Sequence, residues 1–137
     1  MALECTLHHE TEIPIGMTVA DGTGIEKGAV LILTDANTVA TTTGDTDACA
    51  GIAAEEKIAN DGKTKLAVYK RGIFRGFAGA AGVTAGLAVI TDTSTGAANE
   101  LVSADVNSEN LVGRSLETAT DTQSFLFELN PFSVNLA

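Results

Sequence analysis

The chain has 137 residues, with 18 acidic against 8 basic side chains and a formal net charge of -10 at neutral pH. This length suits one domain with its own core. The acidic balance argues against nucleic-acid binding, which usually needs a basic surface facing the phosphates. No apolar run approaches the ~20 residues of a membrane helix, and the first residues lack the pattern of a secretory signal. We therefore expect a soluble protein made in the cytosol, with neither nucleic acid nor membrane as a partner.

Residues 1–15 have the pattern of an extended N-terminal arm, followed by a single β domain over residues 16–137. Apolar and polar residues alternate at first, a polar run follows, and Pro14 interrupts the segment. Such an arm is a poor final strand for its own sheet, but its backbone can add to a strand of a neighbouring subunit. The arm residues predicted to contact a neighbour are Leu3, Cys5, Leu7, His8 and His9.

The rest of the chain favours short strands separated by turns, because threonine and valine prefer strands and glycine, aspartate and asparagine prefer turns. No long stretch keeps apolar residues at helical spacing. Only residues 53–59 and 103–111 remain as short helix candidates, the second with Ser103 as its N-cap. We predict a mainly β, barrel-like or tulip-like domain with one to three short helices.

A strand pattern recurs along the chain. A glycine-led apolar strand at 28–33, a glycine-centred strand at 49–53 and an alternating strand at 65–70 are followed by similar segments at 86–91, 111–116 and 124–129. The order predicts two similar halves, about residues 25–75 and 83–131, in a closed or nearly closed barrel that hides its strand edges. Alternation along these strands predicts a core of Val30, Ile32, Ile52, Leu66, Val68, Phe74, Val89, Leu116, Phe125 and Phe127.

Five of the eight cations fall between residues 63 and 75. Cations that alternate along one strand are more typical of a solvated or interface face than of a nucleic-acid groove. We predict that Lys70, Arg71 and Arg75 meet an acidic neighbour, in a contact that salt weakens.

No catalytic or metal-binding pattern is complete. Gly62-Lys63-Thr64 ends like a phosphate-binding loop, but Lys57 stands where that motif needs a glycine. His8 and His9 are adjacent on an extended segment and point to opposite faces. Asp45-Thr46-Asp47 begins like a calcium loop, but Ala50 replaces the glycine of the turn. We therefore predict no enzyme, no cofactor and no metal.

The two cysteines, Cys5 and Cys49, lack the spacing of a redox or metal motif. Cytosolic synthesis favours two reduced thiols, with Cys49 acting as a small apolar core group. A Cys5–Cys49 bridge that pins the arm is the alternative.

Glycine-and-aliphatic segments at 25–31, 50–53, 68–74, 83–89 and 111–114 resemble the small head decoration (capsid cement) proteins of tailed bacteriophages and related viruses. The likeness spans about residues 16–130. It implies a β domain that trimerises on the outer surface of the viral head, bound to the major capsid protein. It also implies a virion protein, made in the host cytoplasm, that stabilises the shell against the pressure of packaged DNA without cofactor or catalytic residues.

Other function classes stay open at this point. A phage tail or baseplate β-module for attachment would need exposed aromatic residues to stack on sugars, and the chain has one tyrosine, five phenylalanines and no tryptophan. Another structural virion subunit is a further alternative. A small hydrolase or lyase is opposed by the incomplete catalytic patterns.

Overall fold

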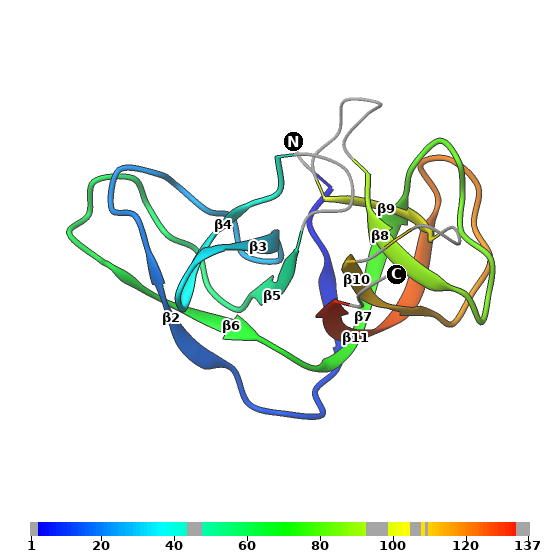
Figure 1. The fold of residues 1–137 in the computed structure, drawn as a ribbon, viewed down its shortest axis with the longest axis horizontal. Coiled ribbons are helices and arrows are strands. Elements are labelled where there is room, and N and C mark those ends of the chain that lie inside the picture. Colours follow the sequence, from blue (N-terminus) through cyan, green and yellow to red (C-terminus); the bar gives the residue numbers. More distant parts are fainter. Residues whose placement is uncertain (1–2, 44–47, 93–98, 105–107, 109, 134–137) are drawn as a thin grey trace.

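The computed structural model describes residues 3–43, 48–92, 99–104, 108 and 110–133 (Figure 1). Its regular elements are all β-strands, which confirms the predicted mainly β, barrel-like fold. Nowhere in these ranges is there a helix long and apolar enough to cross a membrane. In chain order the strands are β1 Thr6–His9, β2 Ile15–Val19, β3 Val30–Asp35, β4 Thr38–Thr41, β5 Cys49–Ala53, β6 Lys65–Tyr69, β7 Gly72–Ala78, β8 Ala88–Thr91, β9 Glu100–Ser103, β10 Asn110–Ser115 and β11 Ser124–Ser133.

Two sets of five strands have the same connections. Strands β2 to β6 close into a barrel in the order β2-β4-β3-β5-β6. Strands β7 to β11 follow the matching order β7-β9-β8-β10-β11, and β11 pairs in turn with β7, so they form a second ring of strands, the second barrel. The parallel β7–β9 pair corresponds to the parallel β2–β4 pair. Strand β7, which the sequence pattern assigned to the end of the first half, instead begins the second set. The two sets lie side by side along the long axis of the molecule (Figure 1).

Each half contains a close approach between strands that requires glycine. A Cβ on Gly51 of β5 would lie 2.2 Å from the carbonyl oxygen of Tyr69, and one on Gly113 of β10 would lie 1.9 Å from that of Glu128. No side chain fits at these distances, so glycine allows each strand to approach its neighbour. The recurring glycine-centred strands of the sequence therefore have a steric cause.

Strands β3 and β5 lie between two apolar clusters. Leu31 and Ala53 belong to the cluster inside the first barrel, whereas Val30 and Ile52 belong to the cluster that fills the second. Burial on both faces explains why these two strands are continuous apolar runs rather than alternating ones. Asn99 adds a polar link between the halves, because its side-chain oxygen accepts a buried 2.9 Å hydrogen bond from the Val30 N–H.

The predicted core is wrong at Leu116, which is 43% exposed. Side chains alternate along β10, and Ser115 takes the inward position with 0% exposure, so Leu116 faces outward. The other predicted core residues are buried, namely Val30, Ile32, Ile52, Leu66, Val68, Phe74, Val89, Phe125 and Phe127.

The predicted helices are also wrong for the residues that the structure describes. Ala53 is the last residue of β5. Residues 54–59 form a loop in which Lys57 and Ile25 exchange backbone hydrogen bonds of 2.8 and 2.9 Å. Pairing with another segment overrides the weak helix preference of so short a stretch. Within 103–111, Ser103 ends β9 and Asn110 begins β10, while residues 105–107 and 109 lie outside the described ranges.

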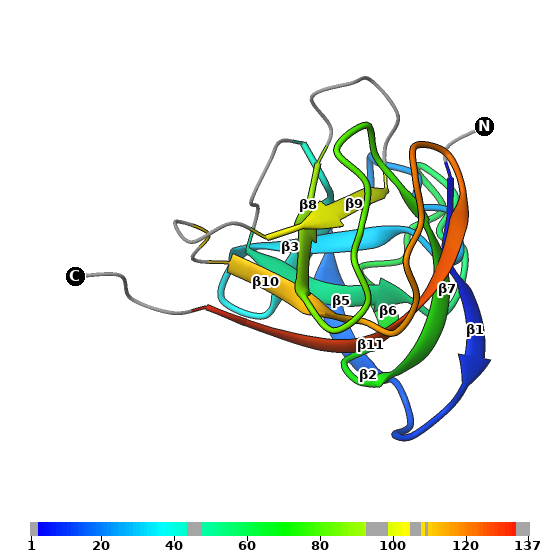
Figure 2. The same cartoon turned by 90° about the vertical axis from the view of Figure 1, so that its right-hand side faces the viewer.

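The N-terminal arm completes the protein's own sheet, contrary to the expectation that it would not. Strand β1 runs antiparallel to β7, with Leu7 opposite Phe74, and Figure 2 shows β1 beside β7. Just before β1, the Cys5 N–H donates a 2.8 Å hydrogen bond to the Gly28 carbonyl oxygen. Pro14 comes after the paired segment, so it does not interrupt the pairing.

Candidate functional site

The predicted contact residues of the arm differ in accessibility. Cys5 is 6% exposed, and Leu7 packs against the core of the second barrel. Both side chains therefore contribute to the fold. His8 and His9 are exposed and Leu3 is half-buried, so a contact through these three stays a prediction.

The cationic segment lies beside the arm, because β1 pairs with β7, but part of its charge is used within the chain. Lys70 Nζ donates a 2.9 Å hydrogen bond to the Ala50 carbonyl oxygen. Arg75 Nη1 lies 3.5 Å from Glu117 Oε1. Arg71 is exposed between β6 and β7. Of the three predicted contact cations, Arg71 is therefore the one most available to a neighbouring protein.

A cleft of about 330 Å³ lies beneath the arm. Its walls are formed by Cys5 and Leu7 on the arm side and by Ile52, Tyr69 and Phe74 on the barrel side. The lining is largely apolar, which suits packing rather than acid–base chemistry.

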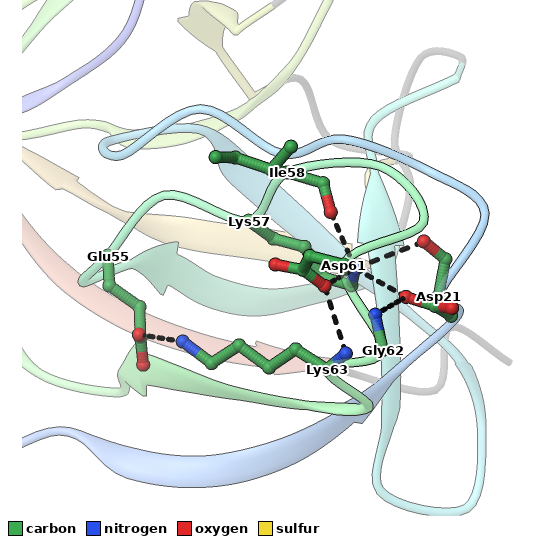
Figure 3. Close-up of polar contacts among 7 residues, drawn as sticks. All are labelled: Asp21, Glu55, Lys57, Ile58, Asp61, Gly62 and Lys63. Carbon is green, nitrogen blue, oxygen red and sulfur yellow. Dashed lines mark hydrogen bonds and ion pairs between the residues drawn. The ribbon is translucent and has the colours of Figure 1, made fainter.

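Lys57, at the loop end of the first barrel, has an extensively hydrogen-bonded side chain (Figure 3). The Lys57 side chain is fully buried. Its Nζ donates to the carbonyl oxygens of Asp21 and Ile58 at 3.0 and 2.9 Å, and to the carboxylates of Asp21 and Asp61 at 3.2 and 2.8 Å. An ammonium has three N–H groups, so one of them is shared between two oxygens. Lys57 thereby links two loops that are far apart in the sequence.

The two aspartates also organise the backbone around Lys57. Asp21 Oδ1 accepts a 2.8 Å hydrogen bond from the Gly62 N–H, and Asp61 Oδ1 accepts a 2.9 Å bond from the Lys63 N–H. Each carboxylate thus serves the ammonium and a turn at once, which fixes the two loops relative to each other.

Glu55 extends this network towards β6. It forms an ion pair with Lys63 and accepts a 2.9 Å hydrogen bond from the Ala67 N–H. The second barrel repeats part of the arrangement, because Glu117 accepts a 2.9 Å bond from the Leu126 N–H.

The electrostatics of the cluster favour its charged form. Burial alone lowers the pKa of Lys57, but hydrogen bonds and the charges of Asp61 and Asp21 outweigh burial and raise the pKa above its usual value. The Lys57 ammonium and the Lys63 N–H lower the pKa of Asp61 to about 2. Hydrogen bonds from Lys63 and Ala67 likewise lower the pKa of Glu55. A buried lysine that stays charged serves here as an internal counter-ion.

Cys5 and Cys49 are free thiols. Burial raises the pKa of each to about 12. A thiol with so high a pKa has almost no thiolate at neutral pH and is a weak nucleophile and metal ligand. Both cysteines therefore behave as apolar groups in this fold.

Metal binding finds no support in the residues whose positions are described, since no group of three or more His, Cys, Asp or Glu among them could hold an ion. Asp45-Thr46-Asp47 lies outside those ranges.

Sequence reasoning missed the Lys57 cluster, although two signals pointed to it. Asp61 follows Lys57 at a spacing of four residues, and the second half has Ala119 at the matching place, 4% exposed. A lysine at a repeat position that is otherwise apolar and buried indicates an internal partner for its charge.

Comparisons with known proteins show a likeness of fold. No family profile and no curated protein matches the sequence. A crystal structure of the N base of head fibre gp8.5 from bacteriophage phi29 is similar, with a TM-score of 0.57 and 11% identity. The match covers 90% of this chain and 98% of that one. The two chains therefore share a fold over almost their whole lengths.

Proposed function

We propose that this chain is a structural protein of a bacteriophage head that binds the outer surface of the shell and stabilises it. The observation that carries the proposal is the fold shared with the phi29 head fibre base, which extends over 90% of this chain and 98% of that one. The resemblance of its glycine-and-aliphatic segments to capsid cement proteins is independent support. The proposed partners are the major capsid protein and further copies of the chain, as a homotrimer.

The physical properties of the chain suit this role. A net charge of -10 keeps free copies apart at high concentration. The closed barrels and the docked arm leave few open strand edges for unwanted sheet addition. A modest contact repeated over a symmetric shell gains strength through avidity. Copies that clamp neighbouring shell subunits oppose their separation when packaged DNA presses outward.

Binding to heads tests this proposal. Purified protein is mixed with heads of the virus that encodes it, prepared without the protein, and bound copies are measured by sedimentation. We expect saturable binding at a fixed number of copies per head and release of DNA at a higher temperature from decorated heads. An unrelated acidic protein of similar size is the control for trapping. Heads that leave the protein in the supernatant would refute the proposal.

A further inference from the structure

The loops at the end of the first barrel correspond in sequence position to the loops at the end of the second barrel, so the two groups of loops can be compared. The isolated bridge between Ile25 and Lys57 in the first half corresponds to the bridge between Val83 and Ala119 in the second. We call residues 20–24 with 55–63 the Lys57 loops, and residues 79–83 with 117–123 the Ala119 loops. Figure 1 shows these two loop groups at opposite ends of the long axis.

The two loop groups are held in different ways. The Lys57 loops are joined by a buried ammonium with four oxygen partners. In the Ala119 loops an alanine side chain takes the corresponding place, and Gln123 Oε1 instead accepts 2.9 Å hydrogen bonds from the Thr120 N–H and hydroxyl. One end of the molecule therefore has a charged cross-link where the other has a local turn.

The side chain displayed next to the cross-link also differs. Ile58 is 64% exposed, while its carbonyl oxygen accepts a hydrogen bond from Lys57 Nζ. The corresponding residue of the second half is Thr120, which is polar. A single exposed apolar residue is ordinary on a protein surface. Ile58 differs from such a residue in two ways. The buried Lys57 ammonium holds its loop through the Ile58 carbonyl oxygen and the Asp61 carboxylate, and the equivalent residue of the second half, Thr120, is polar.

Acidic residues lie on the same loops as Ile58. Glu56 is exposed and forms no ion pair within the described residues. Asp21 and Asp61 keep 40% and 31% of their side-chain surface exposed, while each also binds the Lys57 ammonium inside. The Lys57 loops therefore expose one large apolar side chain together with the acidic side chains of Glu56, Asp21 and Asp61.

We propose that the Lys57 loops form the surface through which the protein contacts the head shell, with Ile58 as the anchor. This inference rests on the proposed head-binding function. The partner that fits is a shell subunit with an apolar pocket bordered by lysine or arginine. An apolar anchor that enters a pocket supplies affinity, and complementary charge around it supplies orientation and speed of association. The Lys57 cross-link holds the loops before binding, so little conformational entropy is lost on contact.

Sedimentation with heads is measured for the unaltered chain and for matched variants. Ile58→Thr introduces the residue found at the equivalent place of the second half, and we expect it to weaken binding by about tenfold or more. Leu33→Thr is the control, since Leu33 is 46% exposed on β3 and is not part of the Lys57 loops. The affinity of this variant should stay within about twofold of that of the unaltered chain. Glu56→Lys should weaken binding more at low salt than at high salt. Circular dichroism and sedimentation velocity of the free variants report fold and oligomeric state.

The outcomes are distinguishable. Loss of binding by Ile58→Thr, with fold and oligomeric state unchanged and Leu33→Thr unaffected, supports the inference. Equal binding of Ile58→Thr and the unaltered chain overturns it and leaves the head-binding function standing. If Ile58→Thr instead changes the oligomeric state of the free protein, the loops contact another copy and the assignment to the shell is wrong. If the unaltered chain does not bind heads, the proposed function and this inference both fail.

Discussion

The docking of the arm on the first barrel depends on Gly28, and a repeat-matched pair of substitutions tests it. Gly28 and Gly86 have nearly the same backbone angle, φ of 90° and 91°. A Cβ on Gly28 would lie 2.2 Å from the Cys5 carbonyl oxygen, whereas a Cβ on Gly86 would meet nothing within 4 Å. Gly28→Ala and Gly86→Ala therefore share the backbone strain and differ in the clash with the arm.

The magnitude follows from these contacts. Either alanine costs about 1–2 kcal/mol for its left-handed backbone. At Gly28 the arm must also move, which breaks the Cys5 N–H hydrogen bond to Gly28, worth about 1 kcal/mol. Movement also exposes the buried Cys5 and neighbouring apolar surface, at about 1–3 kcal/mol. Gly28→Ala should therefore lower the free energy of unfolding by about 2–4 kcal/mol more than Gly86→Ala.

Urea unfolding followed by circular dichroism gives both free energies, and mass spectrometry after treatment with iodoacetamide reports exposure of Cys5. We expect Cys5 to react much faster in Gly28→Ala than in Gly86→Ala. Equal stability of the two variants, together with an unreactive Cys5 in both, would show that the arm is not held against Gly28.

Three further predictions concern the core, the Lys57 cluster and the thiols. Phe125→Ala, at a side chain with 0% exposure, should lower the free energy of unfolding by about 3–5 kcal/mol, whereas Leu116→Ala should change it by less than about 1 kcal/mol. Similar losses for the two variants in urea unfolding would show that Phe125 and Leu116 are not buried and exposed as the fold requires. Folding lowers the Asp61 pKa from 3.8 to about 2, so Asp61→Asn should be less stable than the unaltered chain above about pH 5. This difference in stability should disappear as the pH falls from about 4 to 2. A difference that persists at pH 2 in thermal unfolding would argue against the ion pair. Cys5 and Cys49, each with a pKa near 12, should react with iodoacetamide at pH 8 at least about tenfold more slowly in the native than in the unfolded chain; equal rates would show that neither thiol is buried.

Features with a periodic or repeated signal could be predicted from the sequence. The continuous apolar runs at β3 and β5 indicated buried strands, and the glycine-centred strands around Gly51 and Gly113 marked equivalent places in two similar halves. These predictions succeeded because apolar runs and a glycine repeated at the same place in both halves are visible in the local sequence. Leu116 shows the limit, since moving the inward position by one residue to Ser115 reverses the face of every side chain.

Long-range contacts had no such signal. The arm pairs with β7 across more than sixty residues, and nothing in its local pattern distinguishes a strand of the same chain from one of a neighbour. Lys57 lies 36 residues from Asp21, and its loop looked like a short helix because alanine and glutamate precede it. Both errors arise where pairing with a distant segment outweighs local preference. The proposed head contact depends on a partner surface that this sequence does not encode.

Sedimentation of purified protein with heads that lack it is the direct test of whether the chain binds the outer surface of a phage head. We expect saturable binding with a constant number of copies per head, and protection of those heads against loss of DNA on heating. Protein that stays in the supernatant across the whole concentration range, with its fold intact by circular dichroism, would contradict the claim.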